Sequence, residues 1–310
     1  MEINMKYITL GSSSLTVPTM AIGCMRLAGL SLTQAESFLR YAIEQGACFF
    51  DHADIYGGGQ CETIFSEALR YNDDGREKLI LQSKCGIRPG VCYDFSKAHI
   101  LSSVDGILRR LKTDYLDVLL LHRPDALMDP DEVAEAFDTL YSTGKVKHFG
   151  VSNHSPMQIE LLQKSLHQPL VANQLQMSVA HAYMVTEGLH VNMGDEGAIN
   201  RSGAVLDYCR LHNITVQPWS PLQYGMFRGV LLNHEKFPAL CKKLDAIAEA
   251  YAVHPSSIAM AWLLRHPAHL QPVTGTTSIP HLADCLAACD IRLTREEWYE
   301  IYLSAGNTLP

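Results

Sequence analysis

The sequence predicts an α/β fold in which eight parallel strands alternate with helices and close into a (β/α)8 or TIM barrel. Short apolar runs alternate with amphipathic stretches of helical length along the chain. Eight repeats without a clear reversal predict parallel strands with right-handed crossovers, and that number favours closure over an open sheet. The 310 residues suit one such barrel, so we expect a single domain over 1–310.

The strands are expected where a short apolar run ends in a polar residue or a glycine. They are Met20–Gly23, Ala47–Asp51, Leu79–Lys84, Asp117–His122, Lys147–Val151, Leu170–Gln174, Thr215–Trp219 and Pro272–Gly275. Helices are expected where apolar residues recur at helical spacing. They include Leu32–Gln45, Glu62–Arg70, Lys97–Leu111, Asp131–Ser142, Pro156–Ser165 and Ser202–His212.

Local signals support several helix ends. Pro255 follows His254 in a first turn, where the missing N–H of proline costs nothing. Gly144 follows another helix, at the position where glycine commonly ends one. Thr294 and Glu297 have the spacing of a capping box, which predicts an extra C-terminal helix over Thr294–Ala305.

Three segments interrupt or precede the alternation. Lys6–Leu10 and Leu15–Val17 predict a small N-terminal β-hairpin, placed to plug the N-terminal mouth of the barrel. Tyr183–Asn200 and Gln223–Pro238 are long insertions of mixed polarity. Because long loops inside a compact domain usually carry function or mobility, we expect these two to matter for function.

The composition narrows the class of protein. A net charge of −8 argues against nucleic acid or an anionic membrane surface as the main partner. The nine cysteines are odd in number and scattered without a CxxC motif, which is typical of free thiols in a reducing compartment. The first residues lack the basic start and apolar stretch of a secretory signal, and no segment approaches the ~20 apolar residues of a membrane span. We therefore expect a cytoplasmic protein.

Four ionisable side chains lie at or just beyond the ends of three successive strands. Asp51 ends one apolar run and Tyr56 follows it in a glycine-rich loop, while Lys84 and His122 end the next two runs. The C-terminal ends of barrel strands converge on one face, where active sites are built. The sequence therefore predicts that an acid, a phenol, an amine and an imidazole meet in one site.

This set of groups suits the reduction of a carbonyl. Hydride adds to carbon, charge builds on oxygen, and a nearby acid must supply a proton. Tyrosine has an ordinary pKa of about 10, and a neighbouring ammonium favours its phenolate. A carboxylate would hold the ammonium charged, and an imidazole would orient the substrate oxygen. Tyr56, Lys84, Asp51 and His122 supply these four roles.

The stretch Asp51-His52-Ala53-Asp54-Ile55-Tyr56-Gly57 resembles the signature of the aldo-keto reductases, and Ser83-Lys84 and Leu120-Leu121-His122 resemble its second and third pieces. The resemblance implies that Tyr56 donates the proton, that Lys84 and Asp51 tune it, and that His122 orients the carbonyl. Residue 52 is His where the family often has Thr.

The resemblance extends to a nicotinamide cofactor. It implies that Ser152, Asn153 and Gln174 hold the carboxamide and that Trp219 stacks on the ring, where the family usually has Tyr. Further cofactor-binding residues implied are Met25, Arg26, Ser220, Pro221, Leu222, Gly275, Thr276 and Thr277. Backbone amides and hydroxyls in the last three would bind phosphate.

The cofactor implied is NADPH, with NADH as an alternative. Many family members place Lys or Arg after strand eight to hold the 2′-phosphate of NADP. Ser278 and His281 stand at those positions here. Each lost charge-assisted contact is worth roughly 1.5–3 kcal/mol, so the choice between the two cofactors stays open.

Other readings remain beside this one. His52, Asp54 and His122 would be zinc ligands in a metal-dependent hydrolase on the same barrel, but no HxH motif ends strand one. A non-catalytic nicotinamide sensor is the other alternative, since potassium-channel β-subunits resemble reductases. Ser152 and Asn153 would also serve as caps for the helix that begins near Pro156.

The substrate is expected to be a small carbonyl compound chosen by four loops, Met25–Leu30, Cys85–Tyr93, Arg123–Met128 and Gln223–Val230. Their Met, Leu, Tyr and Phe residues favour an apolar or aromatic compound. No self-complementary apolar stripe points to an oligomeric state.

Overall fold

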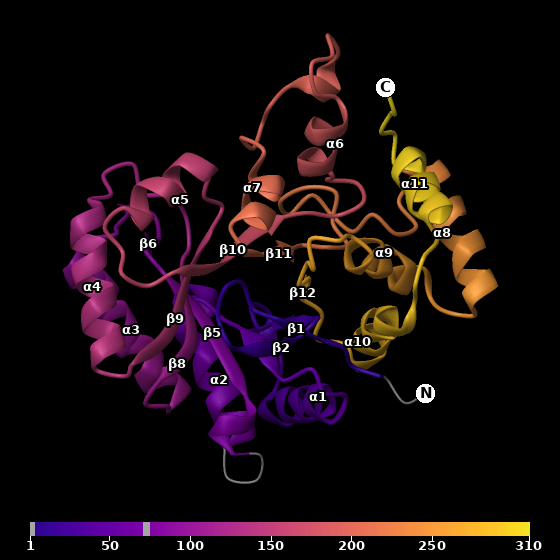
Figure 1. Ribbon diagram of the computed structural model, residues 1–310. Helices are drawn as coiled ribbons and strands as arrows, with labels where there is room; N and C mark the ends of the chain where they lie inside the picture. The colour runs from indigo at the N-terminus through magenta and orange to yellow at the C-terminus, as the bar shows by residue number, and fades with distance from the viewer. Residues whose placement is uncertain (1–3, 71–74) are drawn as a thin grey trace.

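The computed structural model describes residues 4–70 and 75–310. Eight strands form a closed barrel, and each neighbouring pair is parallel (Figure 1). The strands are β3 (Ala21–Gly23), β4 (Phe49–Asp51), β5 (Ile80–Cys85), β8 (Leu116–Leu121), β9 (Val146–Ser152), β10 (Leu170–Gln176), β11 (Thr215–Trp219) and β12 (Val273–Thr274). The predicted fold class is confirmed, while residues 1–3 and 71–74 of the predicted domain lie outside the described part of the chain.

Helices surround the strands in Figure 1. They are α1 (Leu32–Glu44), α2 (Gln60–Leu69), α3 (Lys97–Leu111), α4 (Pro130–Ser142), α5 (Pro156–Gln163), α6 (Tyr183–Leu189), α7 (Val205–Leu211), α8 (Pro238–Tyr251), α9 (Pro255–Leu264), α10 (Ile279–Leu286) and α11 (Arg295–Ser304). Predicted helices match within a few residues at each end. The helix predicted from Ser202 begins later, at Val205, because the Glu187 carboxylate accepts hydrogen bonds from the N–H groups of residues 201, 202 and 204.

The N-terminal hairpin closes the mouth of the barrel at the N-terminal ends of its strands, as predicted. This end is called the lower mouth, and the end at which the strands finish is called the upper mouth. Strands β1 (Tyr7–Thr9) and β2 (Thr16–Pro18) are antiparallel. Leu10, just after β1, and Val17, within β2, are buried among interior side chains of the barrel. The N–H of Gly11 donates to Thr215 Oγ1 at 2.7 Å, at the start of β11. Gly11 has a φ of +54°, and a Cβ there would clash with the carbonyl oxygen of Val171. The turn of the hairpin therefore requires glycine.

The C-terminal helix α11 is also confirmed. Its capping box is formed by Thr294 and Glu297, with N–H to side-chain distances of 2.7 and 3.1 Å. Trp298 on α11 stacks on Trp262 of α9 with ring centroids 4.7 Å apart, and each indole N–H donates to the other residue's carbonyl oxygen. The helix is thus anchored to the barrel's outer layer.

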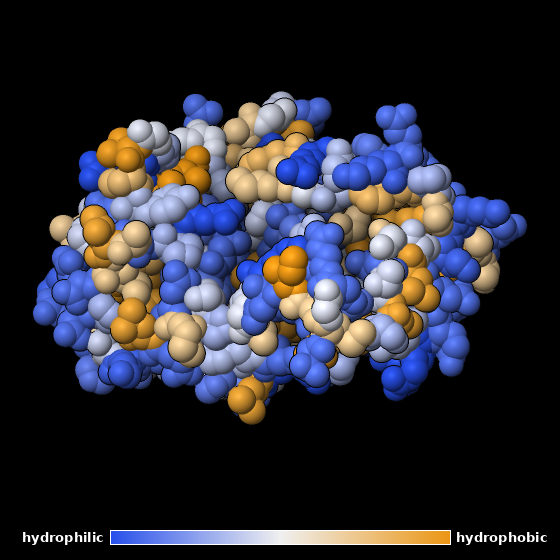
Figure 2. Space-filling view, turned by 90° about the horizontal axis from the view of Figure 1, so that it is seen from above, coloured by the Kyte–Doolittle hydropathy of each residue, from blue (hydrophilic) through white to orange (hydrophobic). Residues whose placement is uncertain are grey.

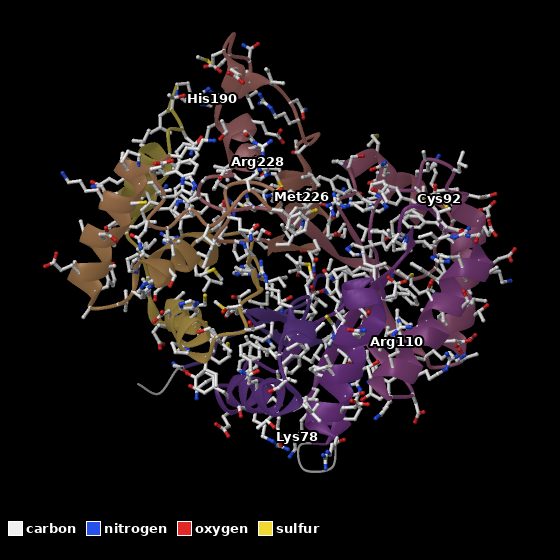
Figure 3. The ribbon with its side chains drawn as sticks, turned by 180° about the vertical axis from the view of Figure 1, so that it is seen from behind. Lys78, Cys92, Arg110, His190, Met226 and Arg228 are labelled. Atoms are coloured by element: carbon white, nitrogen blue, oxygen red, sulfur yellow. The ribbon has the colours of Figure 1, made fainter. Side chains whose placement is uncertain are left out.

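The loops that follow the strands carry extra elements at the upper mouth. A hairpin of β6 (Ile87–Arg88) and β7 (Cys92–Tyr93) follows β5, and α6 lies in the long segment after β10. Exposed apolar side chains on two of these loops include Val91, Tyr93, Met226, Phe227 and Val230. Figure 3 labels Cys92 on the hairpin, and Met226 and Arg228 on the loop after β11.

The outer face seen in Figure 2 is mostly hydrophilic, with hydrophobic side chains gathered in separate patches. Within residues 4–70 and 75–310, none of the helices combines the length and apolar character needed to cross a membrane.

Candidate active site

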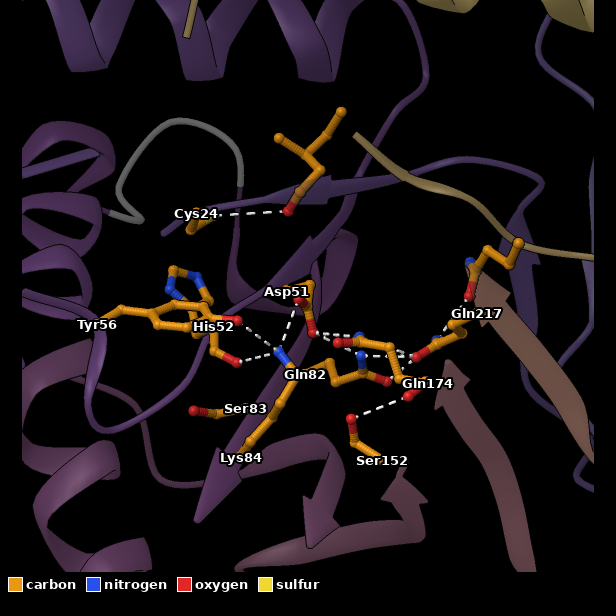
Figure 4. Close-up of polar contacts among 12 residues, drawn as sticks. Cys24, Asp51, His52, Tyr56, Gln82, Ser83, Lys84, Ser152, Gln174 and Gln217 are labelled. Atoms are coloured by element: carbon orange, nitrogen blue, oxygen red, sulfur yellow. Dashed lines mark hydrogen bonds and ion pairs between the residues drawn. The ribbon is translucent and has the colours of Figure 1, made fainter. Parts of the chain in front are cut away.

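A buried ion pair lies at the centre of the site. Lys84 on β5 donates from Nζ to Asp51 Oδ2 at 2.7 Å, to the carbonyl oxygen of His52 at 2.8 Å and to Tyr56 OH at 3.3 Å (Figure 4). The side chain of Lys84 is 0% exposed and that of Asp51 3%. All three ammonium donors are satisfied, so the charge is tolerated in the interior.

The loop after β4 brings Tyr56 over Lys84. Tyr56 begins a 3-10 turn, η2 (Tyr56–Gly59), in which Gly57, Gly58 and Gly59 have φ values of +58°, +63° and +93°. A Cβ on Gly59 would lie 2.8 Å from Arg110 of α3. The positive φ values favour glycine at all three positions, and a Cβ at residue 59 would also displace the Arg110 side chain.

His122 completes the predicted set of four. It directly follows β8, and its ring lies edge-on to that of Tyr56 with centroids 6.0 Å apart. Burial, assisted by Lys84 and Arg123, lowers the pKa of His122 well below its ordinary value. The imidazole is therefore neutral at neutral pH, and its Nδ1 has no hydrogen-bond partner in the part of the chain that the structure describes.

Burial and charge oppose each other at Lys84 and Tyr56. Burial lowers the pKa of Lys84, but Asp51 and Tyr56 outweigh it and the pKa is raised. Burial raises the pKa of Tyr56, and Lys84 opposes it without reversing it. Lys84 thus acts in the predicted direction, but burial has the larger effect, so Tyr56 keeps its proton and can act as an acid.

Four residues expected around a nicotinamide contact one another at neighbouring strand ends. Ser152 Oγ donates to the carbonyl oxygen of Gln174 at 2.9 Å, and Asn153 Nδ2 donates to Ser152 Oγ at 2.7 Å. Trp219 Nε1 donates to Asn153 Oδ1 at 3.1 Å, and Asn153 has a φ of +60°. Hydroxyl, amide and indole are therefore gathered across β9, β10 and β11.

One sequence expectation is wrong here, and Gln174 makes contacts that the sequence did not predict. The N-cap of α5 is Ser155, whose N–H donates to Gln158, so the reading of Ser152 and Asn153 as caps is wrong. The side-chain amide of Gln174 turns into the barrel, where Nε2 donates to Asp51 Oδ1 at 3.0 Å and to Gln217 Oε1 at 3.3 Å. A buried carboxylate is a strong acceptor and attracts this amide.

The remaining cofactor candidates lie on loops after β3, β11 and β12. Arg26 Nη1 donates to the carbonyl oxygen of Gly275 at 2.6 Å and so joins the first of these loops to the last. Ser278 caps α10 through the N–H of His281, and its own N–H donates to Thr276 Oγ1. The other candidates there are Met25, Ser220, Pro221, Leu222 and Thr277, of which Pro221 is buried.

The residue types present fit a nicotinamide dinucleotide. Trp219 offers an aromatic ring, Ser152 and Asn153 offer groups that bind an amide, and Arg26 offers a cation for phosphate. A metal ion fits poorly, because the described residues contain no group of three His, Cys, Asp or Glu side chains able to hold one. His52 instead packs edge-on to Phe65, with ring centroids 4.6 Å apart.

The sequence reasoning missed two parts of the site. Gln82 Nε2 donates to Asp51 Oδ1 at 2.7 Å from inside the barrel. Behind the Tyr56 loop, buried Glu62 accepts from Arg110 Nε at 2.7 Å and from Ser83 Oγ at 2.8 Å; Figure 3 labels Arg110. Gln82 and Glu62 are each a polar residue in an otherwise buried stretch, and this was the signal that could have pointed to them.

Fold and site together define a barrel oxidoreductase, and comparison with known proteins gives its class. Residues 19–302 match the Aldo/keto reductase family, so the chain belongs to that family. Members act on small carbonyl compounds with nicotinamide cofactors.

Several relatives are similar over nearly their whole length. The uncharacterized oxidoreductase YcsN of Bacillus subtilis is 35% identical over 93% of this chain and 94% of its own. A 6-dehydroglucose reductase of Agrobacterium fabrum is 32% identical over 95% of this chain and 96% of its own. The crystal structure of the thermostable aldo-keto reductase Tm1743 with the inhibitor epalrestat superposes with a TM-score of 0.78 at 25% identity, covering 97% of this chain and 100% of that one.

Proposed function

We propose that this protein reduces an aldehyde or ketone to the alcohol with NADPH, and that Tyr56 is the proton donor. The observation that carries the proposal is the hydrogen bond from Lys84 to Tyr56 OH, made by an ammonium that also pairs with Asp51. When bound, the nicotinamide supplies the hydride. The residues of the chain supply the proton, the orientation of the carbonyl and the stabilisation of developing charge.

Each residue has a separable task. The carbonyl oxygen accepts hydrogen bonds from the Tyr56 hydroxyl and from an N–H of neutral His122, which polarises the carbonyl carbon. As charge builds on that oxygen, the proton moves from Tyr56 OH to it, leaving a phenolate. The adjacent Lys84 ammonium stabilises the phenolate, and Asp51 keeps the ammonium charged and in place.

Ser152, Asn153 and Trp219 would hold the nicotinamide and Arg26 would bind phosphate. The preference for NADPH is the family default, and Arg26 is a cation already placed between two mouth loops. Tryptophan fluorescence of the apo protein, titrated with NADPH and then NADH, measures both affinities. Binding of neither cofactor would contradict the proposal.

The side chains at the upper mouth of the barrel support a proposal for the substrate class. Exposed Met25, Tyr93, Met226 and Phe227 favour an apolar or aromatic carbonyl, whereas the relatives named 6-dehydroglucose reductase point to a sugar aldehyde. Consumption of NADPH with benzaldehyde and with an aldose compares the two classes directly. Cofactor binding without turnover of any carbonyl would instead favour the sensor alternative.

We also propose a cytoplasmic location, because all nine cysteines are free thiols in the structure. Cell fractionation with detection by antibody tests this, and recovery in a secreted fraction would contradict it.

A further inference from the structure

We propose that Gln82, to which neither motif nor comparison gives a role, is a positioning residue that acts through Asp51 to keep the Lys84–Tyr56 pair in its reactive arrangement. The inference rests on the proposed function and deepens it. It follows from a chain of buried amides that runs through the barrel from the N-terminal hairpin to the site.

The chain of amides begins at the Asp51 carboxylate, where Gln82 binds the oxygen that Lys84 leaves free. While Oδ2 accepts from Lys84, Oδ1 accepts from Gln82 Nε2 at 2.7 Å and from Gln174 Nε2 at 3.0 Å (Figure 4). Gln82 and Lys84 are two residues apart on β5 and therefore point to the same face, the barrel interior. The same strand thus supplies the cation and an amide that orients its counter-ion.

Hydrogen bonds to Gln217 fix the orientation of the Gln82 side-chain amide. Gln82 and Gln217 bond reciprocally, with Gln82 Nε2 to Gln217 Oε1 at 2.9 Å and Gln217 Nε2 to Gln82 Oε1 at 3.1 Å. Gln217 Nε2 also donates to Gln271 Oε1 at 2.8 Å, and Gln271 Nε2 donates to the carbonyl oxygen of Pro18 at 2.8 Å.

The two ends of this chain can only accept hydrogen bonds. The carbonyl oxygen of Pro18 fixes which end of the Gln271 amide is the nitrogen, and this choice passes through Gln217 to Gln82. The ionised Asp51 requires an N–H from Gln82 as well. Both ends therefore select the same orientation, and a flipped amide anywhere would place two acceptors or two donors together.

Packing alone does not account for these amides. Gln82, Gln217 and Gln271 are 0% exposed, and the lower interior of the barrel is otherwise filled by apolar side chains such as Phe49 and Val118. Burying an amide costs free energy that a hydrogen bond only offsets, so an apolar side chain would fill the space at least as well. The amide of Gln82 is explained by what it holds in place, the Asp51 carboxylate.

The titratable groups around the Asp51–Lys84 pair come from several elements. Lys84, Tyr56 and Cys24 face Asp51, while His52 and His122 interact with Lys84. The test therefore compares two variants of the same chain of amides, only one of which touches Asp51.

The experiment measures kcat against pH, with saturating NADPH and a carbonyl that the wild type reduces, for Gln82→Met and Gln271→Met. Gln82→Met removes an N–H donor from a buried carboxylate, so kcat falls about tenfold and its acid limb moves to higher pH, while the Kd for NADPH is unchanged. Gln271→Met removes a buried amide of the same kind without touching Asp51, so its pH profile keeps the wild-type shape.

The variant Gln82→Glu is isosteric and covers the case in which Gln82→Met does not fold. Two carboxyl groups in close contact cannot both ionise easily, so this variant loses activity as pH rises. Lowering the pH returns a proton to the pair and restores a donor to Asp51, so activity relative to wild type increases.

A wild-type pH profile in Gln82→Met, an equal shift in Gln271→Met, or a pH-independent activity ratio in Gln82→Glu would overturn the inference and leave the proposed function standing. A wild-type protein that turns over no carbonyl would overturn both.

Discussion

At the scale of single residues, the site depends on which groups hold protons. Burial keeps Tyr56 protonated and His122 neutral, and the ammonium of Lys84 is retained because Asp51 and Tyr56 outweigh its burial. Burial and the charge of Lys84 also act on His52, and they lower its pKa to about 3. Neither ring nitrogen of His52 has a hydrogen-bond partner among the described residues.

His52 makes a prediction about stability. Its folded pKa lies below the ordinary value of 6.5, so the unfolded state binds the proton more readily and stability is lost as pH falls below about 6.5. Between about pH 7 and pH 5, this costs about 2 kcal/mol. His52→Thr should reduce the pH-dependent loss by that amount in urea unfolding. A pH-dependent loss in His52→Thr equal to that of the wild type would contradict this account.

The sequence could name the four ionisable residues but not all of their partners. Asp51, Tyr56, Lys84 and His122 were predictable because strand ends of a parallel barrel share one face. Gln82 was not, because a single glutamine in an apolar run carries no information about the strand it will face. Closure of the barrel places it beside Gln217, 135 residues away.

At the scale of elements, most strands and helices were predictable from apolar periodicity. Helices α8 and α10 were not named, since they border the irregular segment after β11 and the loop after β12. Helix α6 lies inside a segment expected to be irregular, where Glu187 rather than a regular pattern orders the backbone.

The N-terminus of α10 gives a prediction about cofactor choice. Ser278 and His281 stand where the family resemblance expects cations for the 2′-phosphate. Ser278→Lys adds one charge-assisted contact, so the ratio of NADPH to NADH affinity should rise about tenfold. Fluorescence titration measures both affinities. An unchanged ratio would mean that the 2′-phosphate lies elsewhere, and Ser278→Gln is the uncharged control.

Helix α11 gives a prediction about packing. Trp298 is 9% exposed and stacks on Trp262, so Trp298→Ala should lower the free energy of unfolding by about 3–5 kcal/mol. Chemical unfolding followed by circular dichroism checks the value. Tyr299→Ala changes a neighbouring, partly buried ring and should cost less. An equal loss in the two variants would argue against the stacked pair as the anchor of α11.

At the scale of the whole molecule, one closed barrel connects two ends with different tasks. The hairpin seals the lower mouth. The C-terminal ends of β4, β5, β8, β9, β10 and β11, with the residues that directly follow them, gather the candidate site residues at the upper one. The buried amides between Pro18 and Asp51 run between these ends. Under the proposed mechanism, chemistry at the strand ends depends partly on an interior residue, Gln82.

The measurement that tests the central claim most directly is the turnover of Tyr56→Phe. The change removes the phenolic hydroxyl and leaves the ring, so kcat should fall about 100-fold or more while the fluorescence Kd for NADPH stays near the wild-type value. Turnover equal to that of the wild type would contradict the assignment of Tyr56 as the proton donor.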